Sequence, residues 1–328
     1  MPETAAEPQK GRAPIDFAGA TDAGRVRTVN QDSHFVGELG GRKVAAIVAD
    51  GMGGHRTGEV ASEKAVQILR SELERGRSHP PVTLARALQT ANLAIYDYAA
   101  EHPESSGMGT TCTVVVLDDQ VGLVAHVGDS RAYLLREGEL RQLTLDHTWV
   151  ADRVRQGILS EEEAKQHRWR NVITNVLGSH PEIRVELLHF EVRQGDRILL
   201  CSDGISMLLS PEVMKRILSD ADPAKASQEL VDEANKRGSP DNITAVVLRA
   251  NAVESHPKRY ALPQRSAFEG KTVALGETMS GIREIEDEYP SQGFFSKLRR
   301  QPWYPYRFWL LGCLYLVLLI VLFSLWSR

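Results

Sequence analysis

The chain has 328 residues, of which 42% are hydrophobic and 25% charged, and it carries a formal net charge of −4. This composition is that of a globular protein, and the length suits one large domain or two ordinary ones. The mild acidity, without a dominant basic stretch, argues against nucleic acid as the main partner.

The first part of the chain predicts a tail followed by strands. Residues 1–14 contain three prolines and several charges without periodicity, so we expect them to be disordered. They also lack the apolar core of a signal peptide. Apolar runs at 15–20, 33–39 and 44–49 predict three strands, and a Gly-Gly pair at 40–41 predicts a hairpin turn between the last two.

Two helices are predicted next. Between residues 58 and 75, apolar side chains recur at helical spacing, and Gly76 ends the pattern. A second helix begins at Pro80 and ends near residues 102–103.

The middle of the chain is dominated by short strands. Apolar runs at 112–117, 121–127 and 132–136, with a weaker one at 140–143, are separated by short polar turns. This spacing predicts an antiparallel sheet. Residues 146–180 then interrupt the strands with polar sequence, and we expect them to form a flap that contacts protein substrates.

Beyond the flap the strand and helix signals return. Strands are predicted at 183–191, 197–201 and 242–248, and helices at 211–219 and 223–236. The whole order predicts two antiparallel sheets packed together with helices outside.

The C-terminal part has a different composition. Residues 251–306 are polar and predict a flexible linker. Residues 307–327 predict a transmembrane helix, because 308–326 holds 19 residues without a charge and about 20 apolar residues span a bilayer. Aromatic residues flank the run and basic residues precede it, which favours a single-pass anchor with the main domain in the cytoplasm. The alternative is a buried core helix, which an entirely apolar terminal segment behind a polar linker makes less favourable.

The cysteines agree with a reducing compartment. Cys112, Cys201 and Cys313 are far apart and odd in number, and no CxxC zinc pattern occurs. We therefore expect reduced thiols.

Aspartates recur where predicted strands meet polar turns. Asp50 follows the run 44–49 and precedes three glycines within four residues; the others are Asp32, Asp129, Asp203 and Asp241. Converging carboxylates repel one another, and a divalent cation removes that penalty. Neighbouring glycines let backbone carbonyls approach a hard cation. Each aspartate alone could be an ordinary turn residue, but their recurrence favours a metal site.

Nine short motifs occur in a fixed order across about residues 15–250. They are Asp22-x-Gly24-x-Val26-Arg27-x-x-Asn30-Gln31-Asp32, Asp50-Gly51-Met52-Gly53-Gly54, Gly58-Glu59-x-Ala61-Ser62, Gly109-Thr110-Thr111, Val127-Gly128-Asp129-Ser130-Arg131, Asp146-His147-Thr148, Asn171-x-x-Thr174, Ser202-Asp203-Gly204 and Asp241-Asn242-Ile243-Thr244. With this ordered set the chain resembles the metal-dependent serine/threonine protein phosphatases of type 2C, in particular their bacterial branch.

The resemblance implies a fold and a metal centre. It implies an α+β catalytic domain over 15–250, built as a four-layer αββα sandwich with a pair of Mn²⁺ or Mg²⁺ ions between the sheets. By motif, Asp50, Asp203 and Asp241 hold this pair together with the backbone carbonyl of Gly51.

Three further residues take roles from the resemblance. Asp129 matches an acid that holds a third, looser ion together with Asp203, and Asp32 matches an acid near the metals. Arg27 matches the arginine that grips the substrate phosphate, where its planar guanidinium can bind two oxygens at once. The implied reaction is attack of an activated water on phosphoserine or phosphothreonine, with phosphorylated proteins as substrates and a serine/threonine kinase as the opposing enzyme.

The chain departs from the family pattern at two positions. Gln31 stands where bacterial members usually have glutamate, which removes one charge near the metals. Met52 stands where some members have a histidine proposed as general acid, and His55, three residues later, is either a substitute or a bystander.

Three other functions compete with this interpretation. They are a pseudophosphatase that retains the fold without metal chemistry, a membrane-tethered binding module, and a different two-metal phosphohydrolase acting on nucleotides or phosphodiesters. Loss of a metal ligand would indicate the first, and a basic track or an aromatic base-stacking groove would indicate the last.

Overall fold

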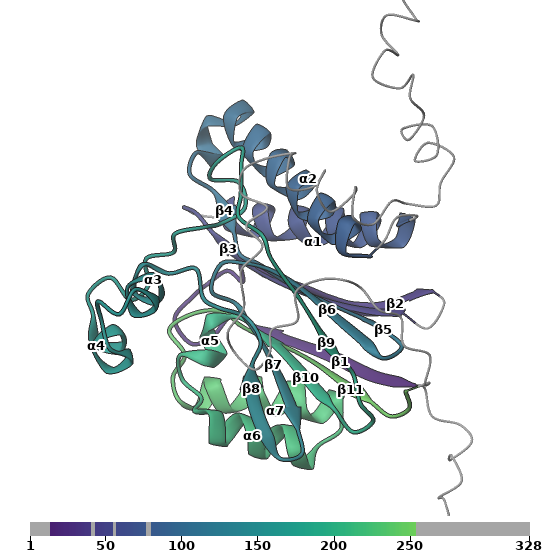
Figure 1. The fold of residues 1–328 in the computed structure, drawn as a ribbon. Coiled ribbons are helices and arrows are strands. Elements are labelled where there is room, and N and C mark those ends of the chain that lie inside the picture. The colour runs from purple at the N-terminus through teal and green to yellow at the C-terminus, as the bar shows by residue number, and fades with distance from the viewer. Residues whose placement is uncertain (1–13, 41–42, 55–56, 77–79, 254–328) are drawn as a thin grey trace, which may run out of the picture.

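The structure is a computed structural model that describes residues 14–40, 43–54, 57–76 and 80–253. Within these residues, two antiparallel sheets pack face to face, with helices on both outer sides (Figure 1). This arrangement confirms the predicted α+β fold with two antiparallel sheets and flanking helices.

The first sheet lies under the two long helices. Its strand order is β2-β3-β5-β6-β9, with β4 paired to the end of β3. The strands are β2 (Asp32–Gly40), β3 (Lys43–Met52), β4 (Gly109–Thr110), β5 (Cys112–Asp118), β6 (Val121–Val127) and β9 (Glu186–Glu191). Helices α1 (Thr57–Arg75) and α2 (Pro80–Glu101) cover its outer face, and a single 3₁₀ turn, η1 (Pro103–Ser105), follows α2 (Figure 1).

The second sheet carries the other helix layer. Its strand order is β1-β11-β10-β7-β8. The strands are β1 (Ile15–Asp22), β11 (Ile243–Ala250), β10 (Arg197–Cys201), β7 (Arg131–Arg136) and β8 (Glu139–Gln142). Helices α6 (Pro211–Asp220) and α7 (Pro223–Lys236) cover its outer face, and the short helix α5 (Asp203–Ser206) follows β10 (Figure 1).

Strand β3 shows why the apolar runs form buried strands. Successive side chains of a strand point to opposite faces of the sheet. Ala45 and Ile47 accordingly pack in the cluster under α1 and α2, whereas Ala46 and Val48 pack in the cluster between the sheets. Because both faces are covered, the sequence of β3 is continuously apolar instead of alternating.

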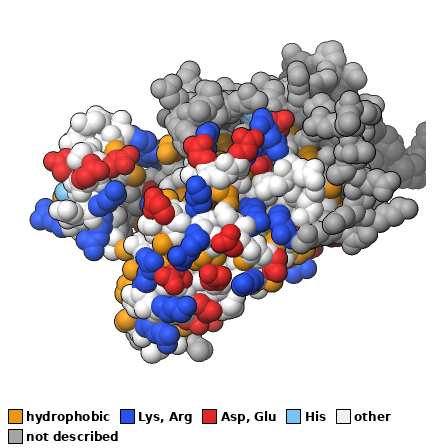
Figure 2. Space-filling model, turned by 90° about the horizontal axis from the view of Figure 1, so that it is seen from below, with side chains coloured by type: hydrophobic (Ala, Val, Ile, Leu, Met, Phe, Trp, Pro, Cys, Tyr) orange, Lys and Arg blue, Asp and Glu red, His pale blue; other side chains and the backbone are white. Residues whose placement is uncertain are grey.

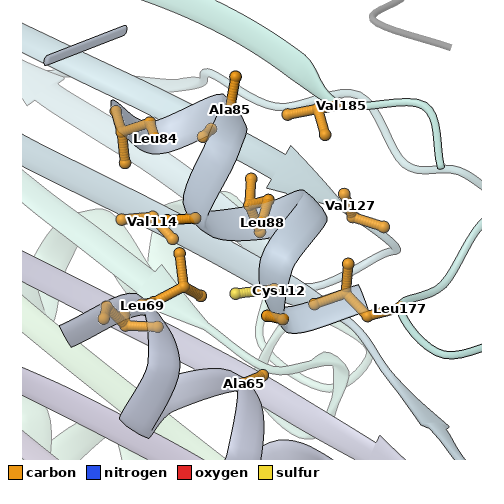
Figure 3. Close-up of a cluster of buried hydrophobic side chains, with 14 of the residues drawn as sticks. Ala65, Leu69, Leu84, Ala85, Leu88, Cys112, Val114, Val127, Leu177 and Val185 are labelled. Carbon is orange, nitrogen blue, oxygen red and sulfur yellow. The ribbon is translucent and has the colours of Figure 1, made fainter. Parts of the chain in front are cut away.

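The helix layer packs on this sheet through small and branched side chains. Figure 3 shows Leu69 of α1 and Leu88 of α2 directed toward Val114 and Cys112 of β5. All four are fully buried. Burial also raises the pKa of the Cys112 thiol, so this cysteine is an inert part of the core.

The flap projects from one end of the sandwich (Figure 1). It contains α3 (Trp149–Arg155), which Thr148 caps, and α4 (Glu161–Gln166), which begins with a capping box between Ser160 and Glu163. Ser160 is therefore the N-cap residue of α4.

The structure corrects the expected boundaries of several elements. Strand β3 does not stop before Asp50 but continues to Met52, because Gly51 and Met52 pair with Thr110 and Gly109 of β4. Asp32 is not in a turn but begins β2, directly opposite Asp50 in register. Strand β9 begins at Glu186, three residues later than predicted.

The features predicted for the two ends of the chain lie almost entirely outside its described part. The tail 1–13, the linker beyond residue 253 and the span 307–327 lie outside the described residues. Within the described ranges, every helix is too short or too polar to cross a membrane.

Candidate metal centre

Both sheets contribute carboxylates to one end of the sandwich. Asp32 and Asp50 face each other across β2 and β3. From the other sheet, Asp203 begins α5 immediately after β10, and Asp241 lies just before β11. Asp129 lies in the turn between β6 and β7, where the chain passes from one sheet to the other. The predicted metal-ligating aspartates therefore come from five separate segments.

Asp32 joins the two sheets through hydrogen bonds. Its Oδ2 accepts from the hydroxyl of Ser202 at 2.7 Å and from the hydroxyl of Thr244 at 2.6 Å. Its other oxygen, Oδ1, is buried without a hydrogen-bond partner. Burial, together with the charges of Asp203 and Asp241, raises the pKa of Asp32 to about 7.

Asp50 is fixed by its own backbone. Its N–H donates to the Thr111 hydroxyl at 3.0 Å, and its carbonyl accepts from the Thr110 hydroxyl and the Thr111 N–H, each at 2.9 Å. Burial raises the pKa of Asp50 well above its usual value, and the charges of the four other aspartates raise it further. The pKa shift thus shows that all five carboxylates lie within electrostatic reach of one position.

Asp203 and Asp129 are also buried carboxylates with raised pKa values. Burial raises the pKa of Asp203 to about 6, with a further contribution from Asp241, and its Oδ1 is buried without a partner. Burial raises the pKa of Asp129 to about 7, followed by the charges of Asp203 and Asp146. A buried carboxylate whose oxygen lacks a donor is costly unless a cation compensates it.

The backbone packs closely beside these carboxylates. A Cβ added to Gly51 would lie 2.0 Å from the carbonyl oxygen of Gly58 and 2.6 Å from that of Gln31. Only glycine fits at position 51, and its N–H donates to the Gln31 carbonyl at 3.1 Å. Two unpartnered carboxylate oxygens among five mutually repelling acids are hard oxygen donors, which fit Mn²⁺ or Mg²⁺.

Arg27 is held by one of the predicted metal ligands. Its Nε lies 3.0 Å from Oδ1 of Asp241, and one of its terminal nitrogens donates to Oδ2 at 3.0 Å. This two-pronged pair raises the pKa of Arg27, through the Asp241 hydrogen bond first. The Arg27 side chain is 53% exposed, so its outer face is accessible to a ligand. Its predicted role on substrate phosphate stays a prediction.

Asn242 and Thr244 hold the segments that carry Arg27 and Asp32 in place, and neither was predicted to have a role at the site. The side chain of Asn242 donates to the carbonyls of Ala23 and Val29, each at 3.0 Å, and accepts from the N–H of Gln31 at 2.8 Å. It thereby ties the loop that carries Arg27 to the start of β11. The signal was present, because Asn242 directly follows the predicted ligand Asp241 and Thr244 is the second residue of the buried strand after it.

Both departures from the family pattern, Met52 and Gln31, lie within the described residues. Met52 lies at the end of β3, paired with Gly109. His55 lies outside the described residues, so both alternatives for it, a substitute general acid or a bystander, stay open. The Gln31 backbone is fully used, since its carbonyl also accepts from the Ser62 hydroxyl at 2.6 Å.

Comparison with known proteins places this geometry in a family. A family model described as protein phosphatase 2C matches residues 21–235. The serine/threonine protein phosphatase PstP of Mycobacterium tuberculosis is 35% identical over 300 residues, covering 87% of this chain and 56% of PstP. The chain thus spans just over half the length of that relative. The serine/threonine phosphatase stp of Listeria innocua is 35% identical over 240 residues, covering 71% of this chain and 95% of the relative.

Solved structures agree with the sequence relatives. The crystal structure of the PstP catalytic domain in complex with two manganese ions superimposes with a TM-score of 0.64 at 36% identity, covering 72% of this chain and 97% of that structure.

Without metal, we expect the acidic cluster to make the stability of the protein depend on pH. The pKa values of about 7 for Asp32 and Asp129 and about 6 for Asp203 exceed the usual value near 3.9 in an unfolded chain. Between about pH 4 and 7 the folded state binds more protons than the unfolded state, so the free energy of unfolding contributed by these groups falls as the pH rises.

The substitution Asp32→Asn removes one such charge and keeps an oxygen that can accept from Ser202 and Thr244. With EDTA present, urea unfolding should show this variant more stable than the wild type at pH 8, by on the order of a few kcal/mol, and equal to it near pH 4. Asp220→Asn, at an exposed position, is the control. A stability difference that does not change with pH would contradict the assigned electrostatics.

We expect Arg27 to compete with a cation for Asp241. Replacing it by glutamine should tighten Mn²⁺ binding a few-fold, a modest effect because the pair is partly exposed. Isothermal titration calorimetry measures this, with Arg25→Gln as the matched control, since the side chain of Arg25 donates to the backbone carbonyl of Asn235 and not to an aspartate. Weaker Mn²⁺ binding in Arg27→Gln would show that the arginine supports the cation site instead of competing with it.

Proposed function

This chain belongs to the protein phosphatase 2C family, and from that premise we propose that it hydrolyses phosphoserine and phosphothreonine in proteins. The proposal is carried by one observation: five carboxylates from both sheets converge, burial raises the pKa values of Asp32, Asp50, Asp129 and Asp203, and Asp32 and Asp203 each keep a buried oxygen without a hydrogen-bond partner. In the proposal, Asp50, Asp203, Asp241 and the Gly51 carbonyl hold a pair of Mn²⁺ or Mg²⁺ ions.

The residues of the chain divide the work around such a pair. When bound, the ions activate water for attack and neutralise charge on the phosphoryl oxygens. Arg27, once its guanidinium leaves Asp241, binds two phosphate oxygens and orients the phosphorus for in-line attack. Water adds its oxygen to phosphorus, the bond to the serine or threonine oxygen breaks, and that oxygen gains a proton. No nucleophilic side chain is needed.

Two acids have supporting roles in the proposal. Asp32 adds a negative charge beside the pair, and its position is fixed by Ser202 and Thr244. Asp129 interacts most strongly with Asp203 among its charged neighbours, which supports the proposal that these two residues hold a third ion.

The flap has the surface expected for contact with protein substrates. Trp169 and Val172 are 41% and 46% exposed. The rings of Trp149, His167 and Trp169 contact one another, and the guanidinium of Arg168 lies over the ring of Trp169. An exposed aromatic surface with adjacent arginines suits a phosphorylated polypeptide better than a small molecule.

The competing functions receive less support. All predicted metal-ligating aspartates are present and converge, which disfavours a pseudophosphatase or a simple binding module. Figure 2, which views the molecule from below, shows acidic and basic side chains interspersed over the described surface on that side. The absence of a continuous basic track on this face, within the described residues, disfavours an enzyme that acts on nucleic acid.

Hydrolysis of a phosphothreonine peptide tests the function directly. We expect phosphate release with Mn²⁺, loss with EDTA, and a decrease of at least about 100-fold in kcat for Asp203→Asn, since removing one charged ligand weakens electrostatic stabilisation of the transition state. Asp220→Asn, on the exposed end of α6, should retain full activity. No turnover by the wild type with excess Mn²⁺ would refute the proposed phosphatase activity.

We further propose that residues 307–327 anchor the domain on the cytoplasmic side of the inner membrane, where it opposes a serine/threonine kinase. The uncharged run 308–326 and its length near that of a bilayer support this. The full chain should fractionate with membranes after alkaline extraction, whereas a chain ended at residue 255 should be released with its peptide activity unchanged. Release of the full chain would contradict the anchor.

A further inference from the structure

A second cluster of ionisable side chains lies apart from the aspartates, at the root of the flap. His126 of β6, His147 at the start of the flap and Glu186 of β9 are each at most 1% exposed. One ring nitrogen of each histidine and one carboxylate oxygen of Glu186 all lie within 4.8 Å of one another. Such a group could bind a transition metal. Because a protonated ring nitrogen cannot be a metal ligand, the positions of the protons on the two histidines decide whether it does.

The hydrogen bonds of His147 argue against a metal. Its Nδ1 receives the backbone N–H of Gly128 at 3.1 Å and the side-chain amide of Asn175 at 2.9 Å. The orientation of that amide is fixed, because Asn175 also donates to the Arg184 carbonyl and accepts from the Arg184 N–H. Nδ1 is therefore an acceptor, and the other ring nitrogen carries the proton. Binding a metal there would require an imidazolate.

His126 has the opposite arrangement. Its Nε2 lies 3.1 Å from the carbonyl oxygen of Leu145, which can only accept, so this nitrogen carries a proton. Its Nδ1 lies 2.9 Å from the Thr113 hydroxyl, and that hydroxyl donates its one proton to the Ser130 carbonyl at 2.9 Å. Both contacts are hydrogen bonds only if Nδ1 also carries a proton. The ring is then a cation.

Glu186 supplies the opposite charge. Its Oε2 accepts from the N–H of Leu145 at 3.2 Å, and the carbonyl of Leu145 accepts from His126. The backbone of Leu145 is therefore bonded to both Glu186 and His126. We propose that His126 is a buried imidazolium paired with Glu186, and that this pair is a positioning device that fixes the first residues of the flap against the turn that carries Asp129.

The remaining charged neighbours are consistent with this arrangement. Arg131 of β7 binds Asp146 through two nitrogens, so neither charge is left for the pair. Burial lowers the pKa of His147 to about 2, with contributions from His126, Arg184 and Arg155. His147 therefore stays neutral beside the His126 cation. Removing one partner of a buried pair is strongly destabilising because the other charge is left uncompensated.

The pair acts on the turn at Asp129 through short connections. The N–H of His147 donates to the Gly128 carbonyl at 2.7 Å, and the N–H of Gly128 returns to His147 Nδ1. Residues on both sides of Asp129, Gly128 and Arg131, are thus bonded to the flap root. The consequence for a metal at Asp129 rests on the proposed function, whereas the charge of His126 does not.

Nuclear magnetic resonance of the full chain, ¹⁵N-labelled at histidine in detergent micelles, tests the charge. At pH 7.5 we expect two protonated ring nitrogens on His126 and one on His147. In Glu186→Gln, His126 should lose one of its protons, whereas Glu191→Gln, an exposed position on the same strand, should leave both. A neutral His126 in the wild type at this pH would overturn the proposal, and this result is independent of catalytic activity.

Amide hydrogen exchange tests the positioning role. Glu186→Gln should speed exchange at Leu145 and His147 by at least about tenfold and leave exchange at β10 unchanged, whereas Glu191→Gln should change neither. Equal exchange at Leu145 and His147 in Glu186→Gln and in the wild type would show that the pair does not hold the flap root. If Glu186→Gln fails to fold, the ring protons of wild-type His126 still decide the question.

Discussion

The repulsion among buried carboxylates at one end of the sandwich is the constraint on which the rest of the structure depends. Burial raises the pKa of Asp50, and the charges of Asp32, Asp203, Asp129 and Asp241 raise it further. Nearby hydroxyls cannot neutralise so much charge. The fold holds these groups in place by burying apolar strands behind them, as β3 shows with Ile47 and Val48. The stability of the core thus maintains an arrangement that is unfavourable until cations bind.

Neutral and charged partners are placed around the cluster with different effects. Ser202 and Thr244 orient one oxygen of Asp32 without neutralising it, whereas Arg27 places a full positive charge on Asp241. An arginine can leave a partly exposed carboxylate at low cost. In the proposed mechanism, the same guanidinium therefore binds Asp241 in one state of the protein and substrate phosphate in another.

The strands, the main helices and the predicted aspartates could be found from sequence, because a buried strand is a continuous apolar run and a ligand at its end follows it directly. The register that places Asp32 opposite Asp50 could not, because it depends on the β2–β3 hairpin, whose pairing shifts between Glu38 and Gly40. The hydroxyls that donate to Asp32 belong to Ser202 and Thr244, which lie 170 and 212 positions away in the sequence. His126 was missed because a single histidine in an apolar strand has the pattern of an ordinary core residue.

The central claim is that Asp50, Asp203 and Asp241 hold a metal pair. A crystal of the protein grown with Mn²⁺ and measured at the manganese absorption edge tests it most directly. The account predicts two anomalous peaks about 3.5–4 Å apart, with Asp50 contacting both. A single peak at another position, or peaks at His126 and Glu186, would contradict it.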